Sequence, residues 1–142
     1  FAKETVVLDW LAGREPVAEV EVQALQIGPA AVAANPAEFF CALGREIKRR
    51  SRFPVTAVAE LANGCAGYVP DTEAFAPSGG GYETAMTSYS NLEPAAGPAI
   101  VEASLRCIGR LSPGPLPEEP KVAGPGAEWE YGLLGPDPGD AY

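Results

Sequence analysis

The spacing of apolar positions along the chain predicts a hairpin preceded by a helix. Residues 3–13 place apolar side chains at helical spacing and end at a glycine, which predicts a short amphipathic helix. From residue 18 to 27 apolar and polar side chains alternate, as in a strand with one buried and one solvent-exposed face. Gly28-Pro29 then turns the chain into a strand of small residues at 30–34, so these two segments predict a β-hairpin.

A helical pattern follows the hairpin at residues 37–50, directly after Asn35-Pro36. Glu38 then falls in the first turn of that helix, where a negative charge is favourable. The next strand is predicted at 55–61, and the order strand, helix, strand predicts parallel pairing. A further helix is predicted at 93–111. The expected fold class is mixed α+β, a short sheet with a hairpin and a β-α-β unit flanked by helices.

The composition changes at residue 112, where Pro, Gly and acidic residues begin to dominate. Such a segment buries too little apolar surface to fold alone. We therefore expect a folded domain at 1–111 and an extended acidic arm at 112–142. An aromatic cluster in such an arm indicates docking on a neighbouring surface. The apolar anchors of the arm are Trp129, Tyr131, Leu133 and Leu134.

Charge and composition exclude several classes of function. The net charge of −9 and the pI near 4.4 argue against nucleic-acid binding, and no apolar run is long enough for a membrane span. The chain contains no His, which excludes a Ser-His or Cys-His apparatus or a His-based metal site made by this chain alone. Its three cysteines, Cys41, Cys65 and Cys107, show no CxxC spacing and are interpreted as small buried apolar residues.

The loop at 62–83 is the candidate functional region. It carries two tyrosines, a Pro turn and a Gly run between two segments with core patterns. It also begins at the carboxyl end of a predicted strand, where ligands usually bind in open α/β sheets. Its tyrosines are either packed amphipathic side chains or part of a site. A carbohydrate- or peptide-binding surface on Tyr68, Phe75 and Tyr82 is a further alternative.

Several motifs together resemble one family. They read V-E-V-Q-A-L-Q-I-G, A-A-V-A-A-N-P-A-E-F-F, A-N-G-C-A-G-Y-V-P-D-T-E-A-F and G-G-Y-E-T-A, in this order within residues 18–111. The run resembles the C-terminal part of the catalytic domain of neutral/alkaline ceramidase-like proteins. In that family a zinc ion is held by two His, a Glu and a Tyr beside a Ser nucleophile, with the His and Ser earlier in the chain. The resemblance implies hydrolysis of an N-acyl amide bond in lipid metabolism.

Carried over residue by residue, the resemblance makes Glu38 and Tyr68 zinc ligands, and it places Asn63, Tyr82 and Glu83 around the substrate pocket. Ala37 stands where the family motif has Gly. No catalytic residue is assigned to this chain. Because it has no His, zinc binding and activity would need an N-terminal segment or a partner chain that carries the His ligands.

Two hypotheses follow. The first is the C-terminal portion of a zinc-dependent amidohydrolase, inactive alone. The alternative is a non-catalytic structural module, a homo-oligomer that assembles through its sheet edges and the arm. Because the chain starts at Phe1 rather than Met, we expect a processed product or a piece of a longer protein. The better-known relatives imply a secreted, periplasmic or cell-surface location.

Overall fold

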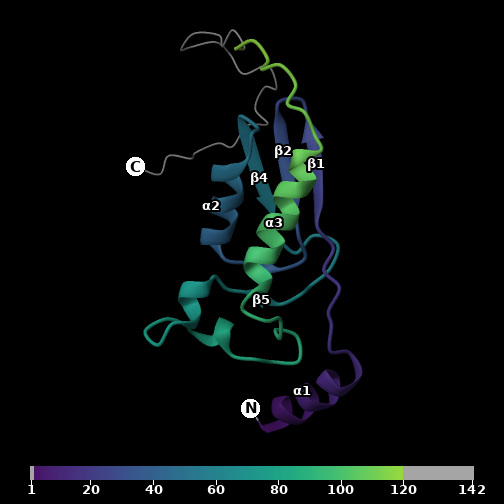
Figure 1. Ribbon diagram of the computed structural model, residues 1–142, viewed down its shortest axis with the longest axis vertical. Coiled ribbons are helices and arrows are strands. Elements are labelled where there is room, and N and C mark those ends of the chain that lie inside the picture. The colour runs from purple at the N-terminus through teal and green to yellow at the C-terminus, as the bar shows by residue number, and fades with distance from the viewer. Residues whose placement is uncertain (1, 120–142) are drawn as a thin grey trace, which may run out of the picture.

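The computed structural model describes residues 2–119. These residues form a three-stranded sheet with two helices on one face, a small two-stranded sheet and a peripheral N-terminal helix (Figure 1), which is the mixed α+β class expected from the sequence. The elements are α1 (Ala2–Arg14), β1 (Gln23–Ile27), β2 (Ala30–Ala34), β3 (Glu38–Phe39), α2 (Cys41–Arg50), β4 (Val55–Ala59), β5 (Tyr68–Val69), the 3₁₀ turns η1 (Thr72–Phe75) and η2 (Tyr82–Thr84), and α3 (Ala96–Gly109).

The larger sheet has the strand order β1-β2-β4. β1 pairs with β2 in antiparallel fashion across the Gly28-Pro29 turn, which confirms the predicted hairpin. β2 pairs with β4 in parallel and α2 lies between them in sequence, which confirms the β-α-β unit. The smaller sheet is the parallel pair β3–β5, formed by the segments that follow β2 and β4.

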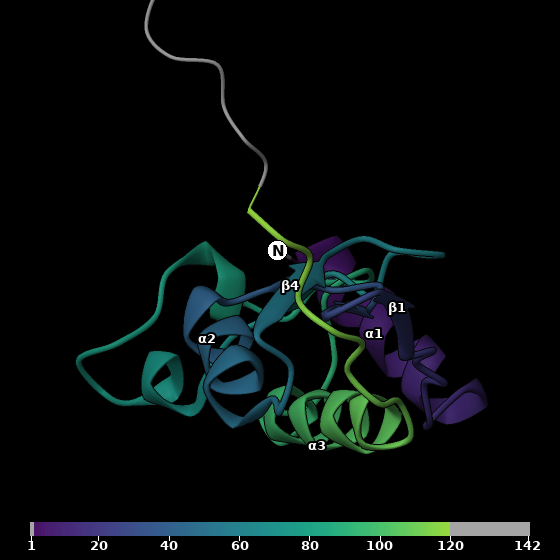
Figure 2. The same cartoon turned by 90° about the horizontal axis from the view of Figure 1, so that it is seen from above.

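The hydrophobic core lies between the larger sheet and the helices α2 and α3, which both cover the same face of it (Figures 1 and 2). Ala31 and Ala33 of β2 point into this core and are fully buried, and their small side chains allow the helices to approach closely. Ile47 of α2 is also fully buried, and burying such a side chain contributes about 1.5–3 kcal/mol. The remaining core side chains include Phe39, Leu43, Phe53, Val69, Ile100, Val101 and Ile108.

The prediction that a helix starts at residue 37 is wrong. α2 begins at Cys41, and Glu38 lies in β3 rather than in a first helical turn. The reason is tertiary, because the backbone N–H groups of Glu38 and Phe40 donate to the carbonyl oxygens of Gly67 and Val69, at 2.9 and 3.2 Å. A backbone that pairs with a distant strand cannot at the same time form a helical turn.

The N-terminal helix α1 forms as predicted but buries none of its side chains. Val6 and Trp10 are 70% and 55% exposed, and the guanidinium of Arg14 lies 4.5 Å from the centre of the Trp10 ring. A hydrogen bond of 2.7 Å from the Ser88 backbone N–H to the Glu4 carboxylate connects α1 to the rest of the domain. Leu8 and Leu11 are half-buried beside a groove that α1 shares with α3, so the amphipathic pattern of α1 gives only partial burial within the described part of the chain.

Other expectations hold in part. Val20 and Val22 pack against the core as predicted, although β1 itself begins only at Gln23. The interpretation of the cysteines as buried is wrong for Cys41 and Cys65, which are exposed: Cys41 is the first residue of α2, Cys65 lies in the loop before β5, and neither belongs to the core cluster.

Residues 112–119 run without regular secondary structure, and the rest of the arm, with its anchors Trp129, Tyr131, Leu133 and Leu134, lies outside the described residues. Within residues 2–119 no helix has the length and apolar character needed to cross a membrane.

Candidate functional site

Segment 35–40 lies between two stretches of the loop that follows β4. On one side, β3 pairs with β5 in a register that sets Glu38 directly beside Tyr68. On the other side, the Leu61 backbone N–H donates to the carbonyl oxygen of Ala37 at 3.2 Å. Paired residues of neighbouring strands project from the same face of a sheet. The fold therefore brings together the two residues that the sequence singled out as ligands.

Two polar side chains hold this segment in place. The Oδ1 atom of Asn35 accepts a hydrogen bond of 3.0 Å from the Ala37 backbone N–H, which turns the chain out of β2. Asn35 is only 1% exposed, so this turn is built into the interior. The carboxylate of Glu60 accepts a hydrogen bond of 3.2 Å from the Phe39 backbone N–H. The backbone on both sides of Glu38 is thus fixed by side chains as well as by strand pairing.

The position of Tyr68 depends on a close contact with the strand-like turn at Tyr89 and Ser90. The Tyr68 backbone N–H donates to the Ser90 Oγ at 2.9 Å, and Ser90 is buried. Gly67 has a φ of +68°, and a Cβ at this position would lie 2.1 Å from the carbonyl oxygen of Tyr89. Only glycine meets both conditions, the positive φ and the close approach of another backbone.

The rings of Tyr68 and Tyr82 meet edge to face, with their centres 5.4 Å apart and their planes at 83°. This contact joins η2 to β5 and brings a third predicted site residue to the pair. Tyr68 is half-buried, whereas Tyr82 is 72% exposed. Glu38, Tyr68 and Tyr82 thus form one cluster at the surface of the described chain, which we call the Glu38–Tyr68 site.

The electrostatics of this site keep the Tyr68 phenol protonated. Hydrogen bonding with the Tyr82 side chain, and then with Glu38, raises the pKa of Tyr68 well above its ordinary value, and desolvation raises it further. A tyrosine hydroxyl is neutral near pH 7 in any case, and the raised pKa makes loss of the Tyr68 proton harder still. A cation that bound here would have to displace this proton, so its uptake would release protons.

The other two predicted pocket residues, Asn63 and Glu83, have contacts outside the Glu38–Tyr68 pair. Asn63 is exposed in the loop, with a positive φ of 60°, and it lines a separate cleft of about 460 Å³ together with Cys65 and Tyr89. The carboxylate of Glu83 folds back toward Gly81. The structure therefore brings Tyr82 to the Glu38–Tyr68 site but gives Asn63 different surroundings.

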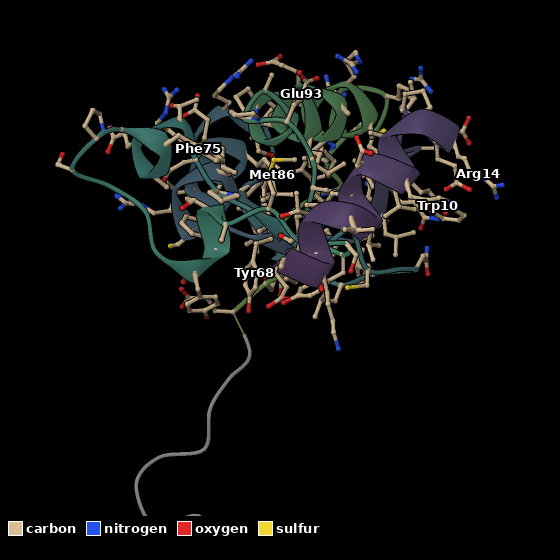
Figure 3. All side chains as sticks on the ribbon, turned by 90° about the horizontal axis from the view of Figure 1, so that it is seen from below. Trp10, Arg14, Tyr68, Phe75, Met86 and Glu93 are labelled. Carbon is tan, nitrogen blue, oxygen red and sulfur yellow. The ribbon has the colours of Figure 1, made fainter. Side chains whose placement is uncertain are left out.

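The aromatic surface considered as an alternative is not assembled either. Phe75 belongs to η1 and lies apart from Tyr68 in Figure 3, whereas the ring contact in this region joins Tyr68 to Tyr82. A larger groove of about 1080 Å³ lies between α1 and the first turns of α3 (Figure 3). It does not include the Glu38–Tyr68 site.

The donor atoms at the site fit zinc in part. A carboxylate oxygen and a phenol oxygen are both acceptable ligands for Zn²⁺, and the register of β3 with β5 makes them neighbours. A tetrahedral site needs four ligands. Residues 2–119 contain no group of three or more His, Cys, Asp or Glu side chains suited to a metal ion. The described chain thus offers two neighbouring donors of the four.

Sequence reasoning missed the residues that position this pair. Ser90 and Glu60 carry no recognisable motif, because each acts through one hydrogen bond to a backbone N–H that only the fold brings near. Asn35 had a signal, since an Asn before a Pro is typical of a turn, but its side-chain bond to Ala37 is visible only in the structure.

Comparison of the chain with protein-family models, with curated proteins and with solved structures gave no match.

Proposed function

We propose that this chain is the C-terminal portion of a zinc-dependent, ceramidase-like amidohydrolase that is inactive by itself. The observation that supports the proposal is the register of β3 with β5, which sets the Glu38 carboxyl beside the Tyr68 phenol. These two residues were singled out from separate motifs of the sequence, and nothing in their spacing requires them to meet. Their adjacency is what a shared ligand would need.

In this proposal Glu38 supplies a carboxylate oxygen and Tyr68 a phenol oxygen. A bound zinc ion would polarise an amide carbonyl or activate a water molecule. Tyr82 supports Tyr68 through the edge-to-face contact of the two rings and through a side-chain hydrogen bond. The chain has no His, so the nitrogen ligands would come from an N-terminal segment or a partner chain.

Zinc titration of the full chain by calorimetry tests the two donors. We expect one weak site per chain, because two oxygen ligands are only half of a complete set. Glu38→Gln and Tyr68→Phe should each abolish this site. Matched controls are Glu73→Gln, an exposed carboxylate on η1, and Tyr89→Phe, an exposed phenol outside the cluster; both should leave zinc uptake unchanged. Equal zinc uptake by all four variants would contradict the ligand assignment.

Native mass spectrometry of the protein from its source tests the incomplete site. A heteromeric mass with one zinc per copy is the expected result, since the missing ligands must come from another segment. If the spectrum shows a zinc-free homo-oligomer instead, the enzymatic proposal fails.

That second result is what the alternative predicts, a structural module that assembles through its sheet edges and the arm. The observation in its favour is that β1 and β4 are the outer strands of the larger sheet as far as residues 2–119 show, and outer strands present unpaired backbone groups. Sedimentation velocity of the full chain and of a chain ending at residue 111 tests the alternative. If the two chains have the same oligomeric state, assembly through the arm is ruled out.

A further inference from the structure

Within residues 2–119, one face of the larger sheet carries no helix. α2 and α3 lie together on the other face, as Figure 2 shows in the view from above. The uncovered face, which we call the open face, is apolar. The register places Val32 between Leu25 and Ala57, and Ala30 between Ile27 and Val55. Within residues 2–119, Leu25, Ile27 and Val55 remain 57%, 71% and 55% exposed.

Such a face is normally covered. When one face of a sheet packs against helices and the other carries aliphatic side chains, that second face usually packs against another element as well. Three strands of five residues, at about 3.3 Å per residue and about 4.8 Å between strands, span only some 200 Å². A stable independent partner needs about 800 Å² on each side. A face of this small size favours an occupant that is tethered to it, such as a segment of the same chain.

The C-terminal arm leads to this face. After α3, the Gln26 Nε2 donates to the Ser112 carbonyl oxygen at 2.6 Å, and the Gly114 backbone N–H donates to the Gly28 carbonyl oxygen at 3.0 Å. A Cβ on Gly114 would lie 3.1 Å from the Gly28 backbone, so the two segments are in close contact. Figure 2 shows the described part of the arm, up to residue 119, running from the end of α3 past the larger sheet toward the side that α3 does not cover.

The sequence of the arm fits an extended occupant. Trp129, Tyr131 and Leu133 alternate with Glu130 and a glycine, so in an extended segment their side chains project to one side. The nine residues at 120–128 can span up to about 30 Å, whereas a five-residue strand is about 16 Å long. A short tether of this kind also raises the effective concentration of the segment to the millimolar range.

We propose that the open face is the docking surface for residues 129–134 of the same chain. Trp129, Tyr131 and Leu133 pack on Leu25, Ile27 and Val55, and the contacts at Ser112 and Gly114 direct the arm over the hairpin end. This interaction is independent of Glu38 and Tyr68. A negative result for this docking would therefore leave the proposed enzymatic role untouched, and the reverse also holds.

Tryptophan fluorescence of the full chain tests the proposal, because the chain has two tryptophans and Trp10→Phe leaves Trp129 as the only one. Trp10 is half exposed on α1, so this change should not disturb the fold. We expect Trp129 to be several-fold less accessible to acrylamide in the native chain than in urea. Leu25→Ser with Ile27→Ser should remove this protection. The control Val17→Ser, at an exposed apolar position outside the sheet, should retain it.

A second variant distinguishes loss of docking from loss of folding. Leu133→Ser lies in the arm, outside the described fold, and should also remove the protection of Trp129 while the circular dichroism spectrum stays unchanged. The proposal is overturned if Trp129 is as accessible in the native chain as in urea. It is also overturned if the protection of Trp129 depends on protein concentration and sedimentation shows a dimer, since a second copy would then cover the face.

Discussion

Glu38 and Tyr68 are direct neighbours in the parallel pair of β3 and β5, although α2 and β4 separate them in the sequence. The pair lies at the surface, and the Tyr82 ring contacts Tyr68 edge to face. Each of the two strands has only two residues. Their backbone N–H groups and that of Ala37 also donate to side-chain oxygens of Asn35, Glu60 and Ser90, and these bonds help to fix the pair. These features lead to three predictions about the isolated chain, in addition to the tests of the two proposals.

Tyr82→Phe should lower the pKa of Tyr68 toward its ordinary value, because hydrogen bonding with Tyr82 is the largest cause of the upward shift. A raised tyrosine pKa stabilises the folded state below the pKa of the unfolded chain. That contribution is lost as the pH rises through the higher folded value. The variant should therefore lose less stability than the natural chain on the alkaline side. NMR titration of the tyrosine Cζ signals measures the shift.

Tyr89→Phe is the control for this titration, since Tyr89 is exposed and does not contribute to the shift at Tyr68. An unchanged Tyr68 pKa in the Tyr82 variant would show that the two hydroxyl groups do not interact in solution.

Gly67→Ala should destabilise the chain by at least about 2 kcal/mol. The new methyl group would lie 2.1 Å from the Tyr89 carbonyl oxygen, at a residue whose φ is +68°. Gly13→Ala is the matched control, because no atom lies within 4 Å of the new Cβ and the position is helical. It should be neutral or stabilise by up to about 1 kcal/mol. Urea denaturation measures both, and similar unfolding midpoints for the two variants would contradict the close contact.

Ser90→Ala should cost about 1–3 kcal/mol, because it leaves the Tyr68 backbone N–H without its acceptor in a half-buried position. It should also speed amide hydrogen exchange at Tyr68. Ser78→Ala, at an exposed loop position, is the control and should change neither quantity measurably. Normal protection of the Tyr68 amide in the Ser90 variant would mean that the backbone pairing alone holds β5.

Much of the larger sheet was predictable because each of its elements has its own local pattern of apolar and polar side chains. The alternation that ends at Gly28-Pro29 and the period of α3 each depend on which side of one element faces the core. The small sheet was not predictable in this way. The residues after Asn35 are compatible with a first helical turn. They form a strand because the backbone N–H groups of Glu38 and Phe40 donate to the carbonyl oxygens of Gly67 and Val69.

The sequence by itself determined the class of the fold, the helices, the hairpin, the change of composition at the arm and the absence of histidine. Each of these features follows from the spacing of side chains or from a count of residues. Spacing and counts can both be read without knowing which distant residues are in contact. The tertiary structure decided that Glu38 meets Tyr68, that Asn63 lines a different cleft and that, in the described part of the chain, both α2 and α3 pack on the same face of the sheet. These relationships depend on which distant backbone groups pair, and the spacing of residues along a chain does not encode that pairing.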